Sequence, residues 1–235
     1  MDNHQDFIGG SSVEEYKGKA EKMLQWGIQA SKDQLLIEHS SVGYGREEYC
    51  IGATLHRGYY YPSPVYDLLV GNEKRGSLRT KPTRSKNISH RYFFDKSDKL
   101  VRIDRFYQER VSGTEYLCYD GNRILGFTID RSGFLAAVSE EVYEGNRLDS
   151  FSLMNCYFIN EQYVCFEYRE EHYYYNTVGL RRFRYIYLSP DSGYFVNNMY
   201  QLEQEDGFLT SYQQIDPEQS GGMQTVYKIS KRRKA

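Results

Sequence analysis

The sequence YDGNRI runs from Tyr119 to Ile124, and YEGNRL follows from Tyr143 to Leu148, 24 residues further on. Glycine and asparagine accept the positive φ that tight hairpin turns require, whereas tyrosine and aliphatic residues favour strands. Each copy therefore predicts a tight turn between two strands. Looser sequences of the same kind, with a polar turn between apolar residues, occupy 94–100, 129–135 and 188–195.

Beyond residue 86 the chain consists of short runs of Tyr, Phe, Ile, Val and Leu separated by Asp, Ser, Gly and Asn. Apolar residues alternate in 88–94 and again in 163–169, which is the period of a strand with one buried face. Hairpins that follow one another with short connections place each strand beside the next. We therefore predict a mainly β fold, an antiparallel β-meander forming an open or curled sheet over residues 86–230.

An N-terminal α-helix is expected over residues 12–37, packed on that sheet. Ser12 and Glu15 have the spacing of a capping box, and apolar residues then recur at steps of three and four. The segment 40–85 is broken by glycine and proline and is expected to be irregular, with a short strand near 48–55 and a short helix after Pro64. The whole chain, 1–235, is expected to form a single domain.

The charge balance excludes several classes of protein. With 30 basic and 32 acidic residues the net charge is −2, so no nucleic-acid partner is expected. The basic run 231–234 is expected to be a solvated tail. The sequence begins without a signal-peptide pattern and has no apolar stretch of membrane-spanning length, so we expect no membrane association and a cytoplasmic location.

Nothing in the sequence is a catalytic or metal-binding signature. The four cysteines lack a C-x-x-C pair, and the five histidines lie apart from them and from one another. Cys50 and His56 are the nearest thiol and imidazole, but a buried structural thiol is the commoner role for cysteine. His90, in an alternating run, is expected to be a half-buried sheet residue. We therefore expect no metal, no cofactor, no catalytic residues and no enzymatic activity.

The repeated hexapeptide resembles the YD-repeat texture of bacterial Rhs-type proteins, in which a Tyr-Asp dipeptide, a short turn and a Gly-Arg-Leu-like return recur. The resemblance covers residues 92–150. The matching residues are Tyr119, Asp120, Arg123 and Ile124, then Tyr143, Glu144, Arg147 and Leu148, with Phe94, Asp95, Lys99 and Leu100 as a fainter third copy. A YD-repeat shell has many more repeats and closes around a cargo, whereas a few turns imply only an open or curled sheet.

In overall type the chain is similar to bacterial immunity proteins, which bind and silence a cognate toxin. That resemblance implies a protein partner, the toxin domain, and directs attention to two tyrosine clusters beside turn-forming residues. Tyrosine offers a large contact area at low entropic cost, and neighbouring glutamates would form a negative rim suited to a basic toxin. The expected partner-binding residues are Tyr59, Tyr60, Tyr61, Glu167, Glu170, Glu171, Tyr173, Tyr174 and Tyr175.

Among these residues Tyr173, Tyr174 and Glu171 are the preferred contacts, although one tyrosine of each cluster is expected in the core. The alternative function is a glycan-binding module or carbohydrate-active enzyme, because aromatic platforms on sheets also stack on sugar rings and scattered carboxylates supply acid and base groups. A structural piece of a larger repeat shell is disfavoured, since the chain carries its own capped helix. The sequence leaves the oligomeric state open.

Overall fold

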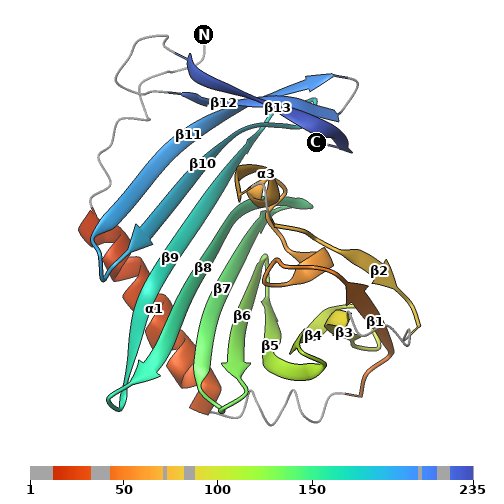
Figure 1. The fold of residues 1–235 in the computed structure, drawn as a ribbon, viewed down its shortest axis with the longest axis vertical. Coiled ribbons are helices and arrows are strands. Elements are labelled where there is room, and N and C mark those ends of the chain that lie inside the picture. The colour runs from red at the N-terminus through yellow and green to blue at the C-terminus, as the bar shows by residue number, and fades with distance from the viewer. Residues whose placement is uncertain are drawn as a thin grey trace.

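The computed structural model describes residues 13–32, 43–70, 73–81, 88–205, 208–215 and 223–234, and within them one large antiparallel sheet carries a single long helix (Figure 1). The helical elements are α1 (Val13–Lys32), the 3-10 turn η1 (Gly58–Tyr60) and α3 (Tyr66–Val70). The strands are β1 (Arg46–Ile51), β2 (Ser77–Arg79), β3 (Ile88–Phe94), β4 (Leu100–Tyr107), β5 (Arg110–Asp120), β6 (Arg123–Asp130), β7 (Leu135–Glu144), β8 (Arg147–Ile159), β9 (Gln162–Tyr175), β10 (Leu180–Ser189), β11 (Tyr194–Glu205), β12 (Phe208–Ile215) and β13 (Met223–Lys234).

The strands from β3 to β13 follow one another across the sheet in sequence order, which confirms the predicted β-meander. β1 pairs with β3, and β2 then pairs with β1, so β2 and β13 are the two edges of an open sheet. The segment 40–85, expected to be irregular, therefore adds two strands at one edge. The short helix after Pro64 is α3. The basic run 231–234 was expected to be a free tail, but its backbone belongs to β13.

The repeated hexapeptide forms two hairpin turns at the same end of the sheet, because 24 residues correspond to two strands. Gly121 and Gly145 take φ values of 59° and 60°, whereas neither Asn122 nor Asn146 has a positive φ, so only the glycine is required for its backbone conformation. The copies also contact each other. The Asn122 side-chain amide donates to the Tyr143 carbonyl at 3.0 Å, and the Tyr143 N–H donates to the Asn122 carbonyl at 2.9 Å.

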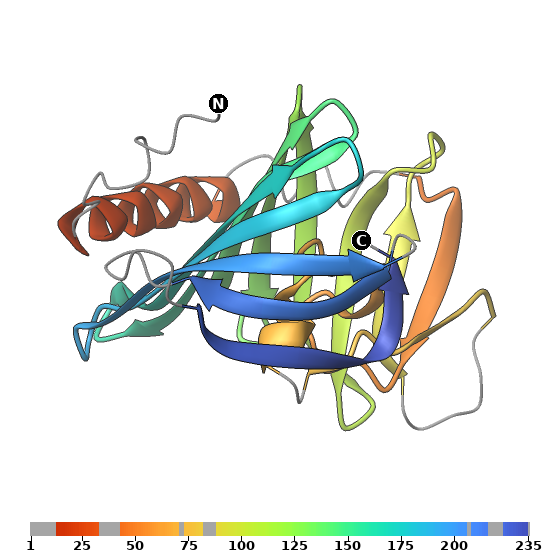
Figure 2. The ribbon, with the colours of Figure 1, turned by 90° about the horizontal axis from the view of Figure 1, so that it is seen from above.

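The two faces of the sheet are covered by different parts of the chain (Figures 1 and 2). α1 lies on the first, the helix face, where its residues Tyr16, Ala20 and Leu24 pack with Phe127 and Met154. The helix was expected at 12–37; it is observed over 13–32, and positions 12 and 33–37 lie outside the described residues. Gly27 sits so close to β7 that a Cβ atom there would lie 2.3 Å from a methyl group of Val138.

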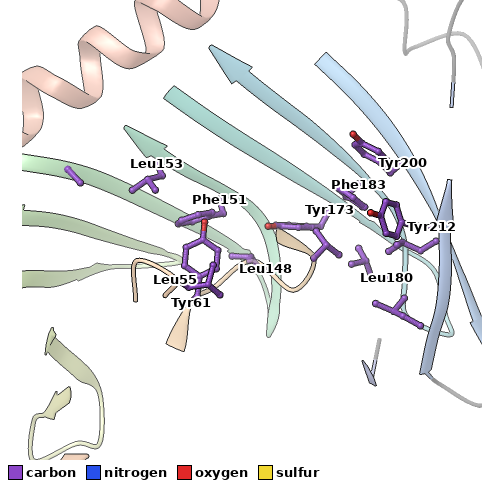
Figure 3. Close-up of a cluster of buried hydrophobic side chains, with 14 residues drawn as sticks. Leu55, Tyr61, Leu148, Phe151, Leu153, Tyr173, Leu180, Phe183, Tyr200 and Tyr212 are labelled. Carbon is purple, nitrogen blue, oxygen red and sulfur yellow. The ribbon is translucent and has the colours of Figure 1, made fainter. Parts of the chain in front are cut away.

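The connection between β1 and β2, residues 52–70 and 73–76, lies over the opposite face and is called the β1–β2 segment below. It carries η1 and α3 and supplies Leu55, Tyr61 and Val65 to a second buried cluster with β8, β9 and β10 (Figure 3). Because both faces of the central strands are covered, residues of both parities along β7 to β10 are buried. This arrangement decides which of the expected site residues reach solvent.

Candidate functional site

Four of the nine residues expected to bind a partner are interior residues. Tyr61 and Tyr173 are each 3% exposed and belong to the cluster under the β1–β2 segment (Figure 3). Glu170 is 4% exposed and Glu171 is 0% exposed, so the expected negative rim is wrong for both. Neighbouring strand residues point to opposite faces of the sheet. Here α1 covers one face and the β1–β2 segment covers the other, so residues of both orientations are buried.

The Glu171 carboxylate has a structural role beneath the β1–β2 segment. The Ser63 hydroxyl donates to it at 2.5 Å, and the Tyr173 hydroxyl donates to the same oxygen at 2.7 Å. Burial raises the pKa of Glu171, and these donors together with the nearby Arg169 charge oppose that rise. Tyr173 and Glu171, two of the three preferred contacts, therefore hold the segment to the sheet and have almost no surface to offer.

On the helix face, Glu170 attaches α1 to β9. Its carboxylate accepts hydrogen bonds from Lys19 at 3.0 Å, from His172 and from the Tyr168 hydroxyl. Burial disfavours the charged carboxylate, but the bonds from His172 and Tyr168 and the positive charges nearby lower the pKa of Glu170 to about 2. This residue is a buried anchor for the helix.

The remaining five residues are dispersed. Tyr59 is 45% exposed, whereas Tyr60, Tyr174, Tyr175 and Glu167 are half-buried. The Tyr60 hydroxyl donates to Glu48 at 2.5 Å, and Glu167 accepts from Asn155 at 2.9 Å. The two clusters therefore do not form one continuous tyrosine surface.

A buried charged network fixes the β1–β2 segment at the centre of the sheet. Arg57 is 2% exposed, and its Nε donates to Glu115 Oε1 at 2.9 Å. Its Nη1 donates to the Glu141 carboxylate, and its Nη2 donates to the Ser139 hydroxyl at 2.7 Å. The guanidinium thus joins β5 and β7 across β6.

Space for this guanidinium comes from Gly126 on β6, where a Cβ atom would lie 2.8 Å from Arg57 Nη2 and 2.3 Å from the Ser139 hydroxyl. Burial alone would raise the pKa of Glu115, but the Arg57 and His56 charges outweigh it and hold that pKa well below the usual range. The same carboxylates raise the pKa of Arg57 against the opposing effect of burial. Arg57 and Glu115 are therefore both ionised at neutral pH.

The thiol of Cys50 and the imidazole of His56 have separate partners. Cys50 donates to the Arg75 carbonyl at 3.2 Å, whereas His56 Nε2 lies 3.4 Å from Glu115 and 3.3 Å from the Thr128 hydroxyl. A nucleophile needs its base within hydrogen-bonding reach, whereas the Cys50 thiol and the His56 imidazole contact different partners. Among the described residues, no group of three His, Cys, Asp or Glu side chains is placed to hold a metal ion.

His90, expected to be half-buried, is 2% exposed. Its Nε2 lies 3.0 Å from the His56 carbonyl and its Nδ1 has no hydrogen-bond partner, so the neutral tautomer carries its proton on Nε2. Burial lowers the pKa of His90 to about 4, and the charges of His56 and Arg105 act in the same direction.

This folded-state pKa lies below the unfolded value, so the stability that neutral His90 provides is complete above about pH 6.5 and is lost as the pH falls toward 4. We expect the free energy of unfolding to drop by roughly 1 kcal/mol per pH unit from this residue alone between about pH 6.5 and 5, above the range of most carboxylates. Urea titrations of the wild type and H90Q at several pH values measure this slope. An equally steep slope in H90Q would contradict the assignment.

Exposed large apolar side chains that were not among the expected site residues surround the β8–β9 turn on both faces of the sheet. Its members are called the hairpin-tip patch: Phe134, Tyr157, Phe158, Ile159 and Phe166, exposed by 37% to 51%. The rings of Phe134 and Phe158 stack at 4.6 Å between centroids, and those of Tyr157 and Phe166 stack at 5.5 Å. The β6–β7 and β8–β9 turns that carry the patch lie at the lower end of the sheet in Figure 1.

One signal in the sequence could have indicated this patch. Tyr157, Phe158 and Ile159 are consecutive large apolar residues directly before the turn at Asn160 and Glu161. A strand cannot bury such a run on a single face, and exposed runs of this kind are rare unless they serve a function. Their burial would have required both faces to be covered to the end of the hairpin, and the core does not extend that far.

A groove of about 400 Å³ separates the β1–β2 segment from the sheet and is lined by side chains of β4, β7, β8 and β9. Its wall is mostly polar and includes Arg105 and Arg169 from the sheet. Tyr66 and Glu73 face these arginines from the segment, and Phe166 of the hairpin-tip patch lies at the border of the groove. No pattern in the sequence indicates this groove, because it is created by a segment that was expected to be irregular.

Comparisons of this chain with protein-family models and with curated proteins give no match. In the part of the chain that the structure describes, no helix has the length and apolar character needed to cross a membrane.

Proposed function

We propose that this protein is a non-enzymatic protein-binding protein of the bacterial immunity type, which silences a cognate toxin in the cytoplasm. The observation that carries the proposal is the hairpin-tip patch, a set of five large apolar side chains held in solvent at one end of the sheet. Clustered exposed aromatic residues are typical of protein interfaces, whereas single exposed apolar residues are ordinary.

The patch is ordered before any partner binds. Ring stacking fixes Phe134 against Phe158 and Tyr157 against Phe166, and Asn160 and Glu161 form a tight turn with positive φ at both positions. A type I′ turn of this kind matches the twist of the strands it joins. Rigid aromatic side chains lose little entropy on binding, which favours affinity.

Charges beside the patch favour a basic partner. Asp191 accepts a hydrogen bond from the Tyr157 hydroxyl at 3.3 Å, and the exposed Glu161 occupies the turn itself. Arg131 on the neighbouring β6–β7 turn is the one exposed basic residue of these turns in the described chain. Opposite charges at an interface rim accelerate encounter and give it a dependence on salt. A nuclease toxin domain has the required basic surface.

The resemblance to YD-repeat and immunity proteins supports the same proposal, because the repeated turns belong to the scaffold that presents the patch. The sheet places the β6–β7, β8–β9 and β10–β11 turns at one end, and the hexapeptide turns at the other. Under this proposal the repeat builds the sheet and the turns at the opposite end select the partner.

The proposal predicts that F158S weakens binding of the cognate toxin domain at least about 30-fold, as expected for loss of roughly 2 kcal/mol at a hot spot. Calorimetry with purified toxin domain measures the affinity, and growth of cells expressing the toxin measures protection. Val178 is 72% exposed at the opposite end of the sheet, so V178S is the matched control and should bind normally. Toxin that kills equally with and without the wild-type protein would refute the function.

A further inference from the structure

The groove beneath the β1–β2 segment contains polar groups that lack partners. Arg169 is 4% exposed, and its Nε has no hydrogen-bond partner. Glu73 lines the same groove, and its Oε2 is buried and likewise unpaired. Buried polar groups are almost always hydrogen-bonded, so two unpaired groups of opposite charge in one groove indicate a polar occupant.

The rest of the Arg169 side chain is firmly placed. Its Nη2 donates to the Tyr61 hydroxyl at 2.6 Å, and the guanidinium carbon lies 3.8 Å from the centre of the Tyr66 ring. The nearest carboxylate in a described ion pair is that of Glu167, at 4.0 Å from Nη1. The guanidinium is thus pre-oriented, with Glu167 as its described ion-pair partner and the buried Glu171 nearby.

Arg105 supplies a second cation. It is half-buried, and its described polar contact is a 3.4 Å approach to His56 Nδ1, with no described carboxylate within ion-pair distance. The charged groups of the groove wall are therefore two arginines and two glutamates, Glu73 and Glu167, so their formal charges cancel. A wall that carries both cations and anions, with no net formal charge, matches a ligand that carries both signs better than a simple anion or an uncharged sugar.

We propose that this groove binds a small zwitterion with a carboxylate and an ammonium group, of the amino acid or dipeptide class. The carboxylate pairs with the guanidinium groups of Arg169 and Arg105. The ammonium donates to Glu73 and Glu167, and the apolar part of the ligand packs against Tyr66 and Phe166. A groove of this volume lies within the range of about 300–1,000 Å³ that small-molecule sites occupy.

Thermal unfolding of the purified full chain with candidate ligands tests the proposal. The probes are the common amino acids and the dipeptide Ala-Ala at about 10 mM, with glucuronate, glucose and inorganic phosphate as comparison compounds. At least one zwitterion should raise the midpoint of the wild type by several degrees, while the comparison compounds leave it unchanged. Calorimetry then gives the dissociation constant of that zwitterion.

Three variants show whether the effect comes from the groove. R105Q and E73Q should each weaken binding roughly tenfold or more, since each removes one charged contact. R110Q alters an exposed arginine on the hairpin next to Arg105 and should bind as the wild type does. Because Arg105 is only half-buried, R105Q should fold even if changes at Arg169 do not.

Absence of any shift with the zwitterions would overturn the proposal, and so would equal binding by R105Q and the wild type. A shift with glucuronate or glucose alone would also overturn it, in favour of carbohydrate. None of these results bears on toxin binding, because the variants leave the hairpin-tip patch intact.

Discussion

Replacing Arg57 with Met is expected to lower the free energy of unfolding at neutral pH by about 3–5 kcal/mol. The guanidinium neutralises Glu115 and Glu141 in a site where all three side chains are at most 4% exposed. Removing the arginine leaves two buried carboxylates without a counter-charge, which is far more costly than the loss of an exposed ion pair. Urea unfolding monitored by circular dichroism gives the difference.

The pH dependence of the free energy of unfolding distinguishes the loss of the buried counter-charge from the loss of packing. Glu115 has a depressed pKa in the folded wild type, so its contribution is present above the unfolded value of about 4.3 and is lost as the pH falls toward the folded value. In R57M that contribution is absent, so the deficit relative to the wild type should shrink as the pH falls below about 4.3 toward the folded value. The triple variant R57M/E115Q/E141Q should recover part of the stability at pH 7. A deficit independent of pH, with no recovery, would contradict the buried network.

Replacing Gly126 with Ala is expected to destabilise the fold by about 1–3 kcal/mol, although alanine is normally better tolerated than glycine inside a strand. A Cβ atom at this position would lie 2.3 Å from the Ser139 hydroxyl and 2.5 Å from Glu115 Oε1. Both atoms are ends of side chains, but they are fixed by Arg57, so the new methyl group displaces the network. The free energy of unfolding measures the cost.

A double-mutant cycle shows whether Gly126 acts through Arg57. In the R57M background the guanidinium is absent and the new methyl group has more room, so G126A should cost much less than in the wild type. G18A is the matched control, because a Cβ atom at Gly18 on α1 meets nothing within 4 Å and should stabilise the helix by up to about 1 kcal/mol. Additive effects of G126A and R57M would show that the glycine has another role.

The sequence was sufficient to predict the β-meander and the N-terminal helix, because both rest on local signals. The turn residues Gly121 and Gly145 determine where strands end, and the three-and-four spacing around Ala20 and Leu24 determines the helix. The pairing of each strand with the next then follows from short connections. These inferences need no knowledge of distant contacts.

The candidate site could not be predicted in the same way, because it depends on which faces of the sheet are covered. Tyr173 and Glu171 look like surface residues in a sheet with one open face, but the β1–β2 segment buries them. The contact of Arg57 with Glu141 joins positions 84 residues apart and leaves no pattern in a single sequence. Conversely, the run 157–159 is apolar enough for a strand interior but is exposed.

Oxidative footprinting with and without the toxin domain proposed as the partner locates the interface, because it reports which side chains lose contact with solvent on binding. We expect Phe134, Tyr157 and Phe158 to become protected from hydroxyl radicals on binding, while Tyr59 and Val178, exposed elsewhere, react as in the free protein. Protection of Tyr59 with unchanged oxidation of Tyr157 and Phe158 would contradict the placement of the interface at the hairpin tip.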